Sequence, residues 1–164
     1  MNARAPLNAA AVPTDAIADF LERYCHMLDD GRVDEWSAFF EDDATYQLTT
    51  RENVEANRPI GIMLCEGRGM MDDRIKALQI ANIYESHTYR HMVGRPLVEP
   101  ELEGRWAVRS SFLVFRTMYT GETALFASGR YDDVVAEGPD GLRFAERRVV
   151  LDSRSLDTLL VYPL

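Results

Sequence analysis

The segment from Trp106 to Asp152 decides the fold: WAVRSSFLVFRTMYTGETALFASGRYDDVVAEGPDGLRFAERRVVLD. It contains three long runs rich in β-branched and aromatic residues, which is typical of strands. The runs are separated by TGET (residues 120–123) and GPDG (residues 138–141), and both have the composition of hairpin turns. Strands joined by such short turns must pair antiparallel. Gly129, in the middle of the second run, is a candidate for a bend or a bulge.

Helical patterns precede this sheet. TDAIADFLERYCHMLDDG, residues 14–31, has apolar residues at helical spacing, with Thr14 as the expected cap and Gly31 as the end. The other expected elements are a short helix at 33–40, a strand at 43–48, a loop at 51–61, a short strand at 62–67 and a helix at 70–81. Helices followed by a long antiparallel sheet predict an α+β domain. A strongly bent sheet around the helices would form a cone, giving a single domain over 14–164 after a flexible or partner-bound arm at 1–13.

The composition narrows the function classes. The chain has 164 residues, 46% of them hydrophobic, and a net charge of −9, so it can build one core and is a poor candidate for binding nucleic acid. It contains no apolar run long enough to span a membrane and no signal-peptide core at its N-terminus, so we expect a cytoplasmic protein. Cys25 and Cys65 form no disulfide framework and no metal-binding or redox motif, and Cys25, on an apolar helical pattern, is expected in the core.

The stretch NIYESHTYRHMVGRP, Asn82–Pro96, holds two of the three histidines and is the leading candidate site. On a strand, Glu85, His87 and His91 would face one side, so an iron site of two histidines and one carboxylate is sterically conceivable. A hydrogen-bonded polar patch is a simpler alternative. We favour a subunit interface, because tyrosine and arginine are enriched in such surfaces.

Each of the other groups of charged residues also fits two different roles. Asp42 and Asp43 fit either a solvated turn or, if buried, acid–base chemistry. Asp72, Asp73 and Arg74 fit the electrostatics of a helix start or a salt bridge to another chain. Arg147, Arg148 and Asp152 on the last strand would either protect a sheet edge or pair with a neighbouring subunit. The apolar end of the sequence, DTLLVYPL, indicates burial under its own sheet or in an interface.

Four stretches resemble known families. LDDGRVDEWSAFFEDDATYQL resembles the signature of cone-shaped, cystatin-like domains of the nuclear-transport-factor type. DDRIKALQIANIYESHTYRHMVGRP is similar to the middle of the small, or β, subunits of bacterial aromatic-ring-hydroxylating dioxygenases. TGETALFASGRYDD and RRVVLDSRSLDTLLVYPL resemble the last strands of the same subunits. The likeness runs from about Ile17 to Leu164 and is nearest to subunits for aromatic carboxylates such as benzoate, halobenzoate, salicylate or terephthalate.

This resemblance implies a trimer of αβ pairs. The α chain would carry a Rieske [2Fe–2S] cluster and a mononuclear Fe(II), and electrons would come from NADH through a reductase. The sequence agrees in one respect, because it lacks the paired Cys and His motif of a Rieske site. We therefore expect no catalytic, cofactor or metal residue in this chain, and a structural role for it. The residues that we expect at subunit interfaces are Arg74, Tyr84, His87, Tyr89, Arg90, His91, Arg147 and Asp152.

A rival hypothesis is a stand-alone enzyme of the cone fold, such as an isomerase, cyclase or dehydratase of a small hydrophobic molecule. It requires an open cavity and an inward-facing acid–base pair, for example Asp43 with His87 or His91. The subunit hypothesis instead predicts a cone filled by side chains, with the polar groups facing outward at an interface. A weaker third alternative is a non-catalytic homotrimer that binds a ligand.

Overall fold

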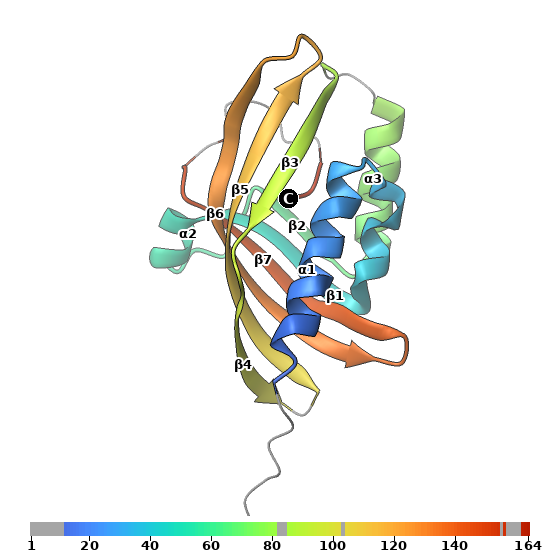
Figure 1. Ribbon diagram of the computed structural model, residues 1–164, viewed down its shortest axis with the longest axis vertical. Coiled ribbons are helices and arrows are strands. Elements are labelled where there is room, and N and C mark those ends of the chain that lie inside the picture. The colour runs from blue at the N-terminus through green and yellow to red at the C-terminus, as the bar shows by residue number, and fades with distance from the viewer. Residues whose placement is uncertain (1–11, 82–84, 103, 155, 157–161) are drawn as a thin grey trace, which may run out of the picture.

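The computed structural model describes residues 12–81, 85–102, 104–154, 156 and 162–164, so most of the predicted N-terminal arm lies outside the described residues. In chain order, its elements are α1 (Thr14–Asp29), the 3₁₀ helix η1 (Val33–Phe39), β1 (Phe40–Thr50), α2 (Arg51–Glu55), β2 (Met63–Glu66), α3 (Arg68–Ala81), β3 (His87–Val93), β4 (Leu97–Leu102), β5 (Arg105–Met118), β6 (Thr123–Gly138) and β7 (Gly141–Leu151). Helices α1 and α3 lie together on one side of a long, curved sheet (Figure 1). The predicted α+β cone is confirmed.

The sheet has the strand order β2-β1-β7-β6-β5-β3, and β4 pairs with β5 beyond the end of β3. Strands β5, β6 and β7 are successive antiparallel neighbours, as the hairpin turns predict. Strand β1 pairs parallel with β7, although about 100 residues separate them along the chain. Bulges at Val114/Phe115 and Val134/Val135 interrupt the regular register, and such irregularities bend a sheet.

Gly129 is not a bulge residue. It pairs with Phe112 on one side and Leu151 on the other in a regular register. A Cβ atom at this position would lie 2.0 Å from the Val150 carbonyl oxygen, so the strands approach too closely for any side chain. Glycine is therefore required by the close approach of two backbones.

Two local predictions for the helices were wrong. Pro13 stands at the N-cap of α1 and Thr14 is its first helical residue, with no side-chain capping bond. The predicted loop at 51–61 begins with the short helix α2, which is capped by the Thr50 hydroxyl accepting from the Asn53 N–H. The prediction that Gly31 ends α1 is confirmed, because its φ of +71° is in the region that favours glycine.

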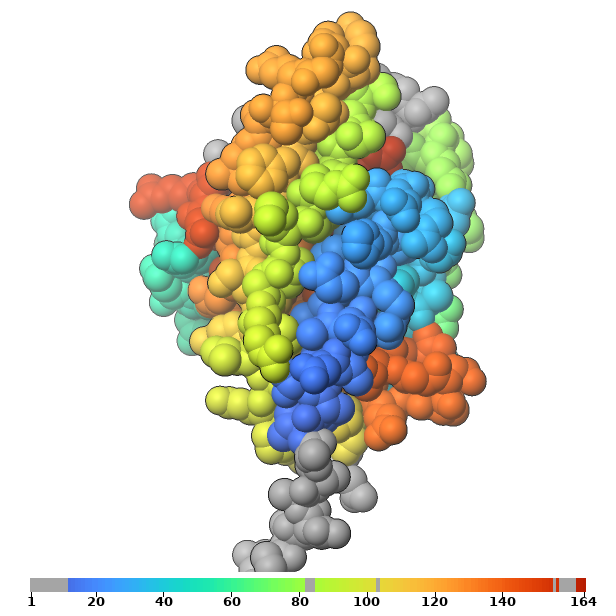
Figure 2. All heavy atoms as spheres, in the orientation of Figure 1, coloured from blue at the N-terminus to red at the C-terminus, as the bar shows by residue number. Residues whose placement is uncertain are grey.

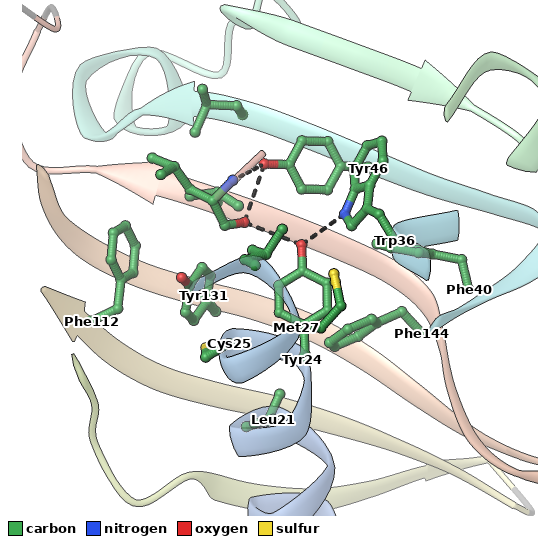
Figure 3. Close-up of a cluster of buried hydrophobic side chains, with 14 of the residues drawn as sticks. Leu21, Tyr24, Cys25, Met27, Trp36, Phe40, Tyr46, Phe112, Tyr131 and Phe144 are labelled. Atoms are coloured by element: carbon green, nitrogen blue, oxygen red, sulfur yellow. Dashed lines mark hydrogen bonds between the residues drawn. The ribbon is translucent and has the colours of Figure 1, made fainter. Parts of the chain in front are cut away.

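The core lies between the concave face of the sheet and the helices. It is dominated by aromatic rings that meet edge to face or tilted, which is the preferred geometry of such pairs. Figure 3 shows Trp36, Tyr46, Tyr24 and Phe144 pointing toward one another within this space. Both cysteines are free and buried, and for Cys25 this burial was predicted. Within the described residues, no helix has the length and apolar character needed to cross a membrane.

Candidate functional site

Strand β3 carries the histidine-rich stretch and is an edge strand next to α1. Because side chains alternate along a strand, His87, Tyr89 and His91 share one side, as predicted, but that side is the concave one and not the expected outer surface; Arg90 and Met92 face outward. Helix α1 packs along β3, and the two lie side by side on the face that Figure 2 shows. The Tyr89 ring is 5% exposed and stacks on Phe126 at 5.1 Å between centroids.

His91 forms a buried pair with Asp29, the last residue of α1. The Asp29 carboxylate lies 2.6 Å from His91 Nδ1 and also accepts the His91 backbone N–H at 3.0 Å. The two side chains are 0% and 2% exposed. The Asp29–His91 bond fixes the orientation of the imidazole and attaches the end of α1 to β3. The other ring nitrogen, His91 Nε2, has no hydrogen-bond partner among the described residues.

The other predicted chemistry around this stretch is not found. Glu85 and Asp43 are both exposed, and Asp43 lies at the start of β1 rather than beside a histidine. The predicted acid–base pair of Asp43 with His87 or His91 is therefore wrong, because Asp29 occupies that position. Among the described residues, no three His, Cys, Asp or Glu side chains are placed to hold a metal ion.

A second buried polar pair lies deeper in the cone, where Arg147 on β7 meets Asp133 on β6. The Arg147 Nη1 donates to Asp133 Oδ2 at 2.7 Å, and the two side chains are 1% and 0% exposed. The guanidinium lies over the rings of Tyr131, Tyr24 and Phe144 at 3.6, 4.3 and 4.6 Å. Burial raises the pKa of Asp133 from 3.8 to about 7, although the neighbouring guanidinium opposes this rise.

The centre of the cone is filled by the chain itself. Leu164 is 0% exposed, and its main chain is held between the Tyr24 and Tyr46 hydroxyls. The predicted burial of the apolar end of the sequence is confirmed for Leu164 and Pro163. A hollow of about 530 Å³ lies away from this centre.

That hollow, named here the outer groove, lies on the opposite face of the sheet. It is lined by Arg51, Met92, Val93, Gly94, Ser111, Phe112, Leu113, Ser128, Gly129, Arg130 and Asp152. Met92 pairs with Leu113 in the register and they are 59% and 40% exposed, while Leu125 nearby is 56% exposed. Arg51 and Asp152 form an ion pair at one end of the groove. This face thus combines exposed apolar side chains with charged groups.

The structure divides the residues predicted at subunit interfaces. Tyr89, His91 and Arg147 are buried within the chain itself, so their side chains cannot contact another subunit, and the prediction was wrong for them. Their strand positions face the concave side, which the helices cover. Tyr84 lies outside the described residues.

The remaining members of the set reach the surface to different degrees. Arg90 is 64% exposed and lies 3.6 Å from Asp29, while Asp152 is 42% exposed. Arg74 and His87 are partly buried. Asp42 is 95% exposed and pairs with Arg68 at 3.0 Å, so it is solvated as expected, although it lies in β1 and not in a turn.

The sequence analysis did not identify Asp29 and Asp133, the two carboxylates that pair with His91 and Arg147 in the interior. Asp29 follows a leucine in the turn at the end of α1, and only the apolar spacing of that helix marks its side as inward. Asp133 lies beside Asp132 in a strand, where alternation alone could have shown that one of the two faces inward.

Comparisons with known proteins agree with this geometry. The model of the SnoaL-like domain matches residues 13–148. The small subunit of anthranilate 1,2-dioxygenase from Burkholderia cepacia is 37% identical over 142 residues, which are 87% of this chain and 88% of that protein. The β 2 subunit of the terminal oxygenase component of terephthalate 1,2-dioxygenase from Comamonas sp. is 38% identical over 148 residues, 90% of this chain and 96% of that protein. A solved β subunit assigned to an aromatic-ring-hydroxylating dioxygenase of Novosphingobium aromaticivorans is 34% identical and superposes with a TM-score of 0.79, covering 85% of this chain and 89% of that one.

Proposed function

The chain belongs to the SnoaL-like domain family and, within it, to the small (β) subunits of aromatic-ring-hydroxylating dioxygenases, and from this premise we propose how it serves such an oxygenase. Its partner is an α subunit. We propose that the complex contains three αβ pairs and that it hydroxylates an aromatic carboxylate. The relatives named for anthranilate and terephthalate act on carboxylated rings, which supports this substrate class.

The filled cone is the observation that best supports an assembly role. In a stand-alone enzyme of this fold, the substrate would need the space that Tyr24, Tyr46 and Leu164 occupy. The His91–Asp29 pair has the form of an acid–base couple, but it is buried where α1 meets β3 and spans that contact. We therefore propose that this chain contributes through its surface, by holding the α subunits in place.

The iron is proposed to lie in the α partner. The donor sets of this chain do not fit either metal group, because the described residues contain no cluster of three ligands and the sequence has no Rieske motif. A Rieske [2Fe–2S] cluster and a mononuclear Fe(II) in the α subunit, reduced by NADH through a reductase, would supply the redox chemistry. The need for NADH supports a cytoplasmic location for the complex.

We propose the outer groove as the surface that meets another subunit. Met92 and Leu113 expose apolar area on a strand face where water would otherwise be their neighbour. Arg90 and Asp152 lie on the same side and can pair with charges of the partner, as rim residues of an interface do. The proposed interface therefore keeps Arg90 and Asp152 from the predicted set. Met92 and Leu113 replace the predicted residues that are buried.

Co-purification tests the proposed function. The tagged chain is expressed with its α partner in cells grown on an aromatic acid, and the mass, iron content and Rieske spectrum of the purified material are measured. A complex of three αβ pairs with iron is the expected result. A metal-free oligomer of this chain alone, turning over a small molecule, would refute it.

The outer groove is tested by Met92→Asp. A carboxylate placed in an apolar contact must be desolvated, so association with the α subunit should weaken at least about tenfold, roughly 1.4 kcal/mol. The matched control is Ile80→Asp, because Ile80 is 84% exposed on α3, away from the groove. Both variants should unfold at the same temperature as the unmodified chain. Equal association of the two variants would exclude this face as the interface.

A further inference from the structure

A second hollow on the outer face of the sheet lies beside α2. Helix α2 is on the side of the sheet opposite to α1 and α3 (Figure 1). The hollow lies between α2, the loop that follows this helix, and strands β1 and β7; it has a volume of about 300 Å³, and we call it the α2 pocket. Its lining consists of Gln47, Thr49, Asn53, Val54, Asn57, Arg58, Pro59 and Arg148. Among the described residues, the lining therefore has two guanidinium groups, four amide or hydroxyl groups, two apolar side chains and no carboxylate.

Hydrogen bonds hold the walls of the α2 pocket in place. The Ile60 carbonyl oxygen accepts from the Thr49 hydroxyl and from the Asn53 side-chain amide, both at 3.1 Å. The Arg58 backbone N–H donates to the Asn53 carbonyl oxygen at 2.8 Å. Thr49 is 2% exposed, so the loop is tied to a buried position of β1. Because the walls are already ordered, a ligand has to immobilise few groups when it binds.

The two arginines of the lining have donors available for a ligand. The Arg58 guanidinium forms no hydrogen bond or ion pair with the described residues. Arg148 Nη2 donates to Glu146 Oε1 at 3.0 Å, but the buried Arg148 Nε atom has no hydrogen-bond partner among the described residues. A buried donor without an acceptor is unfavourable, and a bound acceptor would remove that cost. Guanidinium groups match the geometry of a carboxylate, so the pair points to an anionic ligand.

The surroundings of the α2 pocket favour a monoanion with an apolar body. Glu146 already pairs with Arg148, and Glu55 is exposed beside Val54 at the end of α2. In a chain of net charge −9, these carboxylates disfavour a dianion such as phosphate. Val54 and Pro59 offer an apolar wall to the rest of the ligand. A volume of about 300 Å³ is at the small end of the range of ligand pockets.

We propose that the α2 pocket binds a small organic carboxylate. Arg58 and Arg148 pair with the carboxylate oxygens, and the apolar body of the ligand lies against Val54 and Pro59. The described linings of the α2 pocket and of the outer groove share no residue. The site is therefore separate from the proposed contact with the α subunit and does not depend on it.

An NMR titration of the free, full-length chain with sodium benzoate tests the site. Benzoate combines one carboxylate with an apolar ring, and benzamide is its neutral analogue. We expect benzoate to shift the side-chain amide resonances of Asn53 and Asn57 saturably. Benzamide should bind at least about tenfold more weakly, because it cannot form charge-assisted hydrogen bonds with the guanidinium groups. The absence of a saturable shift, or equal binding of the two compounds, would overturn the proposal.

Matched variants identify the α2 pocket as the place of binding. Arg58→Gln should weaken benzoate binding at least about tenfold, because it removes a charged donor. Arg148→Lys keeps the charge but removes the Nε donor, and it should weaken binding about fivefold. Arg23→Gln is the control, since Arg23 is exposed on α1, on the other side of the sheet, and its loss changes the net charge equally. Its effect should be less than about twofold because of screening. Equal effects of Arg58→Gln and Arg23→Gln would show attraction by overall charge and would refute a site.

The complex with the α subunit separates a free acid from a carboxylate side chain of the partner as the occupant. Equilibrium dialysis measures the labelled benzoate that is bound per αβ pair. The unmodified complex should bind one more benzoate per pair than the complex that contains Arg58→Gln. Equal binding by the two complexes, with binding retained by the free chain, would show that the α subunit covers the pocket, and the proposed free ligand would be wrong.

Discussion

Replacing Arg147 by methionine should destabilise the chain strongly, and the size of the effect follows from the site. The guanidinium is completely buried, and Asp133, at 2.7 Å, is its only carboxylate partner among the described residues. Arg147→Met leaves that carboxylate buried without a counter-charge, which costs about 3–5 kcal/mol of unfolding free energy. For a domain of this size, such a loss lowers the melting temperature by roughly 6–20 °C.

The single variant measures the unfolding free energy that is lost when one partner of the pair is removed. The double variant Arg147→Met with Asp133→Leu measures the net contribution of the whole pair to stability. In the native pair, Arg147 Nε, Arg147 Nη2 and Asp133 Oδ1 have no hydrogen-bond partner among the described residues, so the desolvation of both ions is incompletely offset. We expect the double variant to be within about 1 kcal/mol of the unmodified chain, or more stable.

The single variant should also change the dependence of stability on pH. The pKa of Asp133 is already raised from 3.8 to about 7, and removal of the guanidinium raises it further. Between the unfolded and folded pKa values, the folded chain binds more protons than the unfolded chain, so stability falls as the pH rises through this window. Arg147→Met should therefore lose more stability at pH 8 than at pH 5.

Urea unfolding of the free chain, followed by far-UV circular dichroism at pH 5 and pH 8, measures the stability loss of the single variant, that of the double variant, and the pH dependence of the first. A single variant within about 1 kcal/mol of the unmodified chain would refute the reasoning about the buried charge. A double variant as unstable as the single one would show that the loss comes from packing rather than from the unpaired carboxylate.

Two further predictions concern the attachment of α1 and the close approach of the last strands. Asp29→Asn should lower the unfolding free energy by about 1.5–3 kcal/mol, because the carboxylate accepts both the N–H and the Nδ1–H of His91; an unchanged urea midpoint would contradict this. Gly129→Ala should cost about 3 kcal/mol, because its Cβ would lie 2.0 Å from the Val150 carbonyl oxygen. Gly69→Ala is its control, since a Cβ there meets nothing within 4 Å, and it should keep the melting temperature or raise it slightly.

The strands and their inner and outer faces could be predicted from alternation, but the partners across strands could not. Counting back from the turn at GPDG pairs Asp133 with Glu146, two like charges. The bulge at Val134/Val135 shifts the register by one residue and places Arg147 opposite Asp133 instead. A bulge is hard to recognise in a sequence of alternating residues. The sequence analysis therefore predicted Arg147 at a sheet edge or subunit interface and not in a buried ion pair.

The interface prediction for the histidine-rich stretch was wrong for a related reason. Its polar composition suggested a surface, while the strand period correctly placed His87, Tyr89 and His91 on one side. Whether that side is buried depends on α1, and the residue that makes burial of His91 favourable is Asp29, 62 positions earlier. Burial of a polar side chain thus depended on a distant partner, which neither composition nor local spacing reveals.

The parallel pairing of β1 with β7 has a consequence for how the molecule is made on the ribosome. β1 leaves the exit tunnel with only the four-residue β2 beside it, and its other edge stays open until Gly141–Leu151 has been synthesised. At about 5–20 residues per second, this interval of roughly 100 residues lasts about 5–20 s. Leu164 emerges later still, so its hydrogen bonds with Tyr24 and Tyr46 form only after β7 has been synthesised. During that time the open strand is exposed to wrong partners, which makes early binding of a chaperone, or of the α chain, valuable to this fold.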